Sequence, residues 1–290
     1  MLKSLLVPLT GEKSDIVALE TALAAARPFD GHIEALLVRP DASQFAMRAA
    51  ATEMGSSIMT PQLIAAFEEQ DKRQAAAARR AFEKFCGAHD IAMTDSPPGP
   101  ARVSAVWREK TGGTVHEITG AARFFDVSVF GRSHFCSSLS AEGIGNVLLG
   151  SGRPILIAAD RAKPDLAGTI AIAWKETAEA ARAVSQAMPL LRLAQKITVF
   201  AASEGRDAGI TRASAEGLAN ALRWHKFDVK AVSLNVSGDA DKAVVSAAME
   251  VGATLLVMGG YGHSRLREFV FGGFTRHVLT GAPLPIFLAH

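Results

Sequence analysis

The sequence predicts an α/β fold with a parallel sheet, and it predicts that this unit occurs twice along the chain. Short runs rich in β-branched residues or leucine alternate with longer Ala-rich stretches whose apolar residues recur at helical spacing. The same order of segments appears in both halves, and each half closes with glycine, then proline, then an apolar run. Apolar strands that are each followed by a helix are typical of a parallel sheet covered on both faces.

The individual elements follow from these patterns. We expect strands at 5–8, 33–38, 127–130 and 154–158 in the first half, and at 169–173, 197–201, 255–258 and 285–288 in the second. Helical spacing predicts helices at 14–26, 63–88, 115–123, 178–193, 212–225 and 242–251. The first half also contains an extra helical stretch around 43–70 and a Pro/Gly loop at 96–100.

The internal match predicts two domains, residues 1–160 and 166–290, joined by a charged, proline-containing linker at 160–165. Segment 127–131 matches 255–259, and segment 146–157 matches 277–288. Edge strands seldom stay unpaired, so we expect the last strands, 154–158 and 285–288, to pair with each other. The chain would then form within itself a two-fold pseudo-dimer. The sequence leaves open a further homodimer.

Composition narrows the class of protein. The chain has 290 residues, 49% of them hydrophobic, and a formal net charge of +2, so it is neither a disordered chain nor a polybasic nucleic-acid binder. The sequence contains no long, uncharged apolar run of the kind that predicts a membrane span, and the N-terminus does not resemble a signal peptide. The two cysteines, Cys86 and Cys136, cannot build a disulfide framework. We therefore expect a cytoplasmic protein without membrane or nucleic-acid partners.

A glycine-rich loop follows the strand at 255–258. It begins with Gly259-Gly260-Tyr261-Gly262, and a second pair, Gly272-Gly273, precedes a predicted helix from about Thr275. Glycines let backbone N–H groups approach phosphate oxygens, and a helix N-terminus favours an anion. Three arginines and one glutamate lie between His263 and His277. The loop matches neither the P-loop nor the dinucleotide fingerprint, so spacing alone leaves open that it is only a turn.

The motif nevertheless resembles a known signature. Gly259-x-x-Gly262, nine intervening residues, Gly272 with small residues and Thr275, closed by a helix and an Ala-Pro-x-Pro strand, is similar to the nucleotide-binding signature of the universal stress protein family. The resemblance covers nearly the whole chain and is stronger in the second half. It implies two tandem flavodoxin-like (adenine nucleotide alpha hydrolase-like) domains. Each would be a five-stranded parallel sheet with helices on both faces, binding ATP, with or without Mg²⁺, across the carboxyl ends of the strands.

The resemblance also implies which residues bind the nucleotide. The phosphates and ribose would lie on the glycine loop, and the strand ends would border adenine and ribose. The loop residues are Gly259, Gly262, His263, Arg265, Gly272, Gly273, Phe274 and Thr275. The strand-end residues are Ala173, Trp174, Lys175, Phe200, Ala201 and Met258.

The chain departs from the family pattern at three places. Lys175, and Thr10 in the first half, stand where family members carry an acidic or amide residue, and Gly273 replaces a hydroxyl residue. Lys175 would either help to bind phosphate or select another anionic ligand. In the first half, His134 occupies the position of the second glycine. We therefore expect the first half to bind nucleotide weakly or not at all.

Two other classes of function stay open at this stage. The chain could be a nucleotide-free scaffold or chaperone-like stress protein, or a slow ATPase. No catalytic constellation is evident: His134 and Cys136 lack an orienting carboxylate, and two ligands do not complete a tetrahedral metal site. The sequence therefore favours a binding protein over an enzyme.

Overall fold

The computed structural model of the chain describes residues 1–12, 14–40, 61–132, 141–203, 208–236, 238–260 and 282–290. The strands are β1 Ser4–Leu9, β2 His32–Arg39, β3 Ala92–Met93, β4 Ser104–Thr111, β5 Val127–Phe130, β6 Ile155–Ile157, β7 Thr169–Ala173, β8 Lys196–Ser203, β9 Val229–Asn235, β10 Leu255–Gly259 and β11 Ile286–Ala289. The helices are α1 Ser14–Ala26, the short 3-10 helix η1 Arg27–Phe29, α3 Pro61–Ala88, α4 Thr114–Ala122, α5 Ala141–Ser151, α6 Ala178–Leu191, α7 Ala208–Arg223 and α8 Ala240–Glu250.

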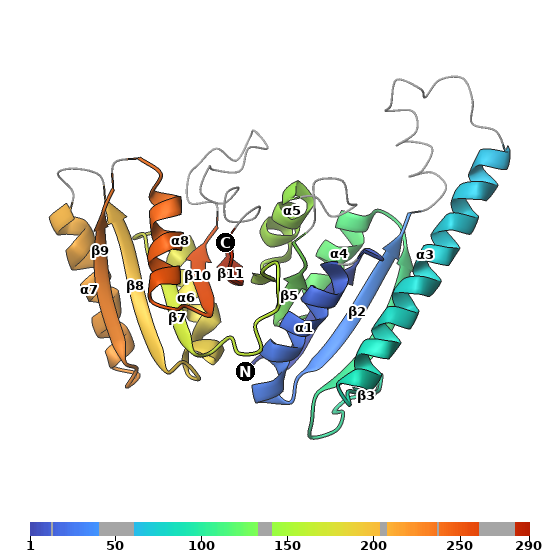
Figure 1. Cartoon of the computed structure of the whole chain (residues 1–290), viewed down its shortest axis with the longest axis horizontal. Coiled ribbons are helices and arrows are strands. Elements are labelled where there is room, and N and C mark those ends of the chain that lie inside the picture. The colour runs from blue at the N-terminus through green and yellow to red at the C-terminus, as the bar shows by residue number, and fades with distance from the viewer. Residues whose placement is uncertain (13, 41–60, 133–140, 204–207, 237, 261–281) are drawn as a thin grey trace.

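The strands form one sheet in the order β3-β4-β2-β1-β5-β6-β11-β10-β7-β8-β9. All neighbouring pairs are parallel except β6 and β11, which pair antiparallel with Leu156 opposite Phe287. The order β4-β2-β1-β5-β6 in the first half (residues 1–160) mirrors β9-β8-β7-β10-β11 in the second (residues 166–290). Figure 1 shows the halves side by side, with both chain termini near the middle. The predicted α/β fold class is confirmed.

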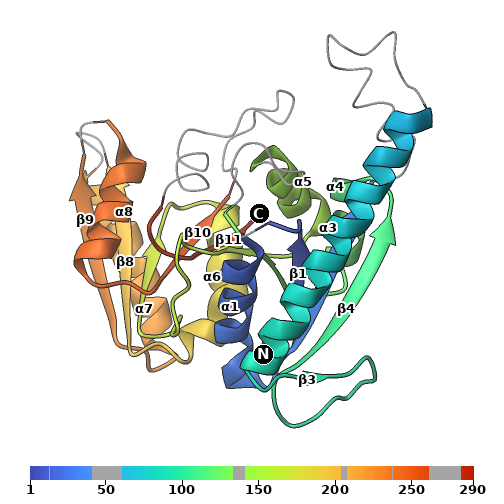
Figure 2. The same ribbon diagram turned by 45° about the vertical axis from the view of Figure 1, so that its right-hand side comes forward.

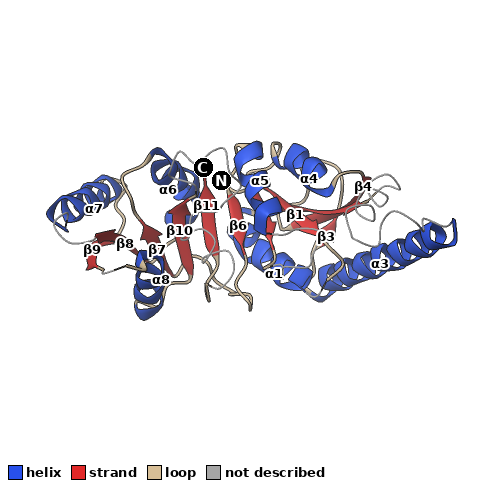
Figure 3. Ribbon diagram, turned by 90° about the horizontal axis from the view of Figure 1, so that it is seen from above, coloured by secondary structure: helices blue, strands red, loops and turns tan. Residues whose placement is uncertain are grey.

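Two hydrophobic cores lie on opposite faces of the sheet. One core contains buried residues of α1, α3, α6 and α7, and the other contains buried residues of α4, α5 and α8. Because the sheet twists across the junction, α3 and α7 cover the same face yet lie on opposite sides of the sheet in Figure 3. Each strand end is thus fixed by apolar packing on both faces, which positions the loops that follow.

Three outer strands, β3, β4 and β9, are missing from the sequence prediction. β4 and β9 each begin with a buried residue, and most of their charged or polar residues are exposed, such as Arg108, Glu109 and Lys110 in β4. They lie at or near the sheet edges and are covered less completely, so they lack the continuous apolar run used to identify buried strands. The two-residue strand β3 adds a sixth strand to the first half, where the resemblance implies five.

The junction between the halves is tied by one side chain as well as by the β6–β11 ladder. Arg132 follows β5, and its side chain is only 9% exposed. Its Nε donates to the carbonyl of Ala158 at 3.3 Å, and its Nη2 lies 3.5 Å from the carbonyl oxygen of Leu284 in the second half.

Within the described ranges, no helix is both long enough and apolar enough to cross a bilayer.

Candidate functional site

The candidate site lies where parallel strands β7, β8 and β10 end side by side, which we call the carboxyl edge of the second half. Ligands of open α/β sheets bind at such an edge. Ala173 and Trp174 are half-buried there, and Lys175 is exposed. The amide of Trp174 donates to the carbonyl of Phe200 at 2.8 Å, which extends the β7–β8 pairing past the strand. Residues predicted on two separate strands are therefore adjacent.

Three other predicted residues form the base of this edge. Phe200, Ala201 and Met258 are 2%, 1% and 3% exposed, respectively. The side chains of Phe200 and Met258 belong to the core beneath α8, and that of Ala201 to the core beneath α6 and α7. They support the strand ends from below, while the accessible atoms of the edge come from their neighbours.

Trp174 is oriented by a helix rather than by the strands. Its indole Nε1 donates to Ser214 Oγ of α7 at 2.9 Å, and its ring packs against the core on that face. Because a buried indole N–H needs an acceptor, this hydrogen bond fixes the ring toward α7. Trp174 therefore forms a side wall of the edge.

Ser203, the last residue of β8, contributes a hydroxyl that the sequence analysis did not single out. The residue is 6% exposed, and its Oγ has no hydrogen-bond partner among the described residues. Strand alternation places it on the same face as Ala201, toward α6 and α7. A buried hydroxyl without a partner costs free energy, so such a group at a sheet's carboxyl edge points to a polar ligand.

Gly259 is required for packing between β10 and α6. A Cβ at this position would lie 2.5 Å from the backbone nitrogen of Ala180 and 2.7 Å from the carbonyl carbon of Glu179. The next residue, Gly260, donates its amide to the carbonyl of Ala289 at 2.8 Å and lies against Leu148 of the first half. The first glycine of the predicted loop thus holds the strand end against the start of α6.

The N-terminus of α6 is capped by its own residues. Thr177 Oγ1 accepts from the amide of Ala180 at 3.3 Å, and the Glu179 carboxylate lies 3.3 Å from Arg182. Hydrogen bonding from its own backbone amide, helped by the Thr177 hydroxyl and the charge of Arg182, lowers the pKa of Glu179. The carboxylate stays charged and complements the helix dipole, so this terminus offers little to an external anion.

Half of the predicted site falls outside the described residues. These positions are Gly262, His263, Arg265, Gly272, Gly273, Phe274 and Thr275. The same holds for His134 and Cys136 of the first half. In the part of the chain that the structure describes, no group of three or more His, Cys, Asp or Glu side chains could hold a metal ion.

Ser203, Ser214 and Thr177 are the polar groups that sequence reasoning missed. A threonine directly before a stretch of helical spacing, with a glutamate in the first turn, is a cap signal and could have identified Thr177. Ser203 and Ser214 carry no such local signal because their surroundings are created by residues of other elements. Only the assembled sheet brings them to the edge.

Comparisons with known proteins agree with this architecture. Residues 153–290 match the model of the universal stress protein family. A universal stress protein of Archaeoglobus fulgidus DSM 4304 has a similar structure, with a TM-score of 0.71, 18% identity, and coverage of 99% of this chain and 95% of that one. No curated protein sequence matches significantly.

Two proteins of Pseudomonas aeruginosa also have similar structures. One, from strain UCBPP-PA14, is provisionally assigned to the universal stress proteins, with a TM-score of 0.57, 14% identity, and coverage of 99% of this chain and 93% of that one. The other, from strain PAO1, is described as functionally unknown, with a TM-score of 0.57, 14% identity, and coverage of 99% and 92%. At these identities the likeness shows the fold. Residues 153–290 of this chain belong to the universal stress protein family, and the whole chain has the fold of a solved member.

Proposed function

We propose that this chain is a stress-response protein whose second half binds ATP or a related adenine nucleotide and signals through its occupancy. The observation that carries the proposal is the buried hydroxyl of Ser203, which has no hydrogen-bond partner within the described part of the chain and lies at the carboxyl edge of a universal stress protein domain. A ligand with hydroxyl or ring-nitrogen groups would supply the missing hydrogen bond.

The described residues fit such a ligand in a consistent way. Ser203 would contact the polar rim of the base or ribose, while Ala173 offers an apolar surface beside it. Lys175 is exposed at the next strand end and carries a positive charge that suits a polyphosphate. The residues from Gly262 to Thr275 would hold the phosphates, as the family resemblance implies.

The melting midpoint of the purified, nucleotide-free protein tests the proposal. ATP and Mg²⁺ at about 100 times the dissociation constant should stabilise the binding half by roughly 2.7 kcal/mol. Gly262→Asp adds a side chain and a negative charge to the loop, and it should abolish the rise without unfolding the protein. No rise in the native protein would favour a nucleotide-free scaffold.

A second pair of variants tests the role of Ser203. Ser203→Ala should weaken ATP binding about fivefold, because a lost hydrogen bond costs about 1 kcal/mol. Thr198→Val is the matched control: Thr198 Oγ1 is also buried without a partner, but it lies near the start of the same strand, far from the edge. Equal effects of the two variants on affinity would contradict the assignment of Ser203.

A further inference from the structure

In the first half, the corresponding edge is covered by the long helix α3. Gln74 of α3 donates from Nε2 to the carbonyl of Thr10, in the loop after β1, at 2.8 Å. A Cβ on the neighbouring Gly11, whose φ is +81°, would lie 2.7 Å from Gln74 Cγ. In Figures 1 and 2 the N-terminal end of α3 extends past the ends of β2 and β4. The helix therefore reaches over the strand ends where a ligand would enter.

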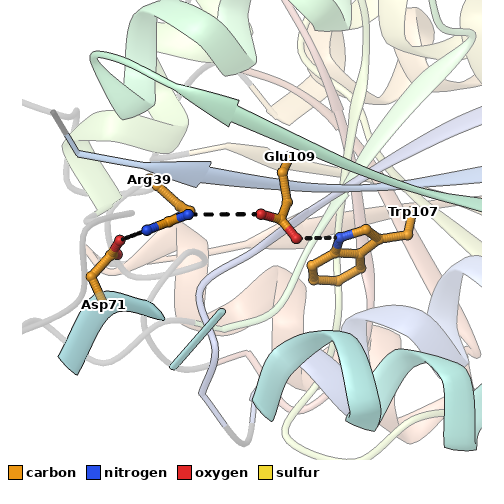
Figure 4. A network of polar contacts seen from close by, with 4 residues as sticks. All are labelled: Arg39, Asp71, Trp107 and Glu109. Carbon is orange, nitrogen blue, oxygen red and sulfur yellow. Dashed lines mark hydrogen bonds and ion pairs between the residues drawn. The ribbon is translucent and has the colours of Figure 1, made fainter. Parts of the chain in front are cut away.

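The closest polar contact at this edge joins β2 to α3. Nε and Nη2 of Arg39, the last residue of β2, both lie 2.6 Å from Oδ2 of Asp71. Glu109 of β4 lies 4.0 Å from Arg39 Nη1 and accepts from Trp107 Nε1 at 2.8 Å (Figure 4). Arg39 and Asp71 are 27% and 18% exposed, so this ion pair is accessible at its rim.

The equivalent positions of the second half carry neither partner. Leu5 and Ile170 are equivalent, because Leu5 pairs with Val127 and Ile170 with the matching Leu255. Leu5 also pairs with Ile33, and Ile170 with Ile197. Arg39, six residues after Ile33, therefore corresponds to Ser203, six residues after Ile197. The buried residues Ala78, Phe82 and Phe85 of α3 have the same spacing as Ala215, Ala219 and Leu222 of α7. This match sets Asp71 against Ala208, the first residue of α7. Cation and carboxylate are thus both particular to the first half.

We propose that the carboxyl edge of the first half is an oxyanion site that the chain itself occupies, with the Asp71 carboxylate bound to Arg39 in place of an external anion. A guanidinium fork recognises phosphate in the same way as it recognises carboxylate. The α3 residues nearer its C-terminus are anchored in the core by Phe82 and Phe85, so removing Asp71 leaves the helix attached. The site then accepts a small oxyanion.

Inorganic phosphate is the probe for this site. Its dissociation constant is measured from the melting midpoint against a chloride series of equal ionic strength, for the native protein, Asp71→Ala and Arg39→Ala/Asp71→Ala. Phosphate should bind Asp71→Ala about ten times more tightly than the native protein, and the double variant should lose this gain. Any phosphate binding by the second half is common to all three proteins and cancels.

Further variants keep the test decisive. Glu83→Ala frees Arg79 on the exposed face of the same helix and should bring no gain in phosphate binding. Asp71→Asn keeps the side-chain shape if Asp71→Ala folds poorly, and Asp71→Ala/Glu109→Gln removes the second carboxylate if it moves onto Arg39. A folded Asp71→Ala/Glu109→Gln protein that binds phosphate no better than the native one would overturn the proposal, as would loss of the fold in every Asp71 variant.

Discussion

The two carboxyl edges of this molecule are built on the same strand order but finish differently. At the end of β2, Arg39 is neutralised by Asp71 of α3, whereas at the end of β8 the buried hydroxyl of Ser203 meets no partner in the ranges that the structure describes. The loops after β1 and β7 differ as well. Asp15 turns back onto the amides of Thr10 and Gly11, while Thr177 caps the next helix in the second half. The shared fold therefore fixes where a site can form, and a few side chains decide whether it is filled.

The largest expected effect tests what the halves share. Gly131 directly follows β5, and Gly259 is the last residue of β10. A Cβ on Gly131 would lie 2.7 Å from the backbone of Ser14, and one on Gly259 would lie 2.5 Å from the backbone of Ala180. Because backbone cannot rotate away as a side chain can, Gly131→Ala and Gly259→Ala should each reduce the free energy of unfolding by about 3 kcal/mol. Urea denaturation of both variants measures this.

Two other glycines serve as controls for that experiment. Gly260→Ala would meet a side-chain methyl of Leu148 first, at 2.9 Å, so it should cost less than Gly259→Ala. Gly217→Ala, in open space on α7, should stabilise the protein by about 0.5 to 1 kcal/mol. A much smaller loss of unfolding free energy for Gly131→Ala than for Gly259→Ala would contradict the structural equivalence of the two halves.

The next effect concerns the loops in which the halves differ. The Asp15 carboxylate accepts from the amides of Thr10 and Gly11 at 3.1 and 2.7 Å, and from the Thr10 hydroxyl at 3.0 Å. Asp15→Ala leaves the two backbone donors unsatisfied and should cost about 2 kcal/mol. Thr177→Ala removes a single cap and should cost about 1 kcal/mol. Thermal unfolding of both variants gives the comparison.

The pH dependence of stability identifies the Asp15 contribution. Burial, opposed by the hydrogen bonds from Thr10 and Gly11, raises the pKa of Asp15 above its ordinary 3.8. The folded protein therefore binds this proton more tightly than the unfolded chain. The resulting stability is present below pH 3.8 and is lost as pH rises through the raised pKa. Asp15→Asn should remove this slope; an unchanged slope would assign it to another group.

The smallest expected effect concerns how much of α3 moves when Asp71→Ala removes its ion pair with Arg39. Burial raises the pKa of the Cys86 thiol to about 11, so little reactive thiolate forms at neutral pH. In a Cys136→Ser background, Cys86 should react with a disulfide reagent only as fast as the protein unfolds. Asp71→Ala should leave that rate nearly unchanged. Rapid labelling would show that the whole helix detaches, not only its contacts with the edge.

Apolar periodicity was enough to predict the fold class and eight of the strands, because buried parallel strands are continuous apolar runs. It failed for β4 and β9, whose outer positions leave charged and polar side chains exposed, and for the two-residue strand β3. The candidate site was predictable only where a local motif exists. Arg39 and Asp71 are 32 residues apart in the sequence, and Ser203 acquires its character from burial, so neither feature has a sequence signature.

The antiparallel pairing of β6 with β11 has a consequence for how the two edges can vary. Two identical chains meeting across such a ladder must repeat every substitution at both sites. Here the two sides are different stretches of one polypeptide, so a mutation changes one side and leaves the other untouched. Because of that independence, Arg39 and Ser203 can occupy equivalent positions. The carboxyl edge of one half can therefore change its ligand chemistry while the edge of the other half keeps its own.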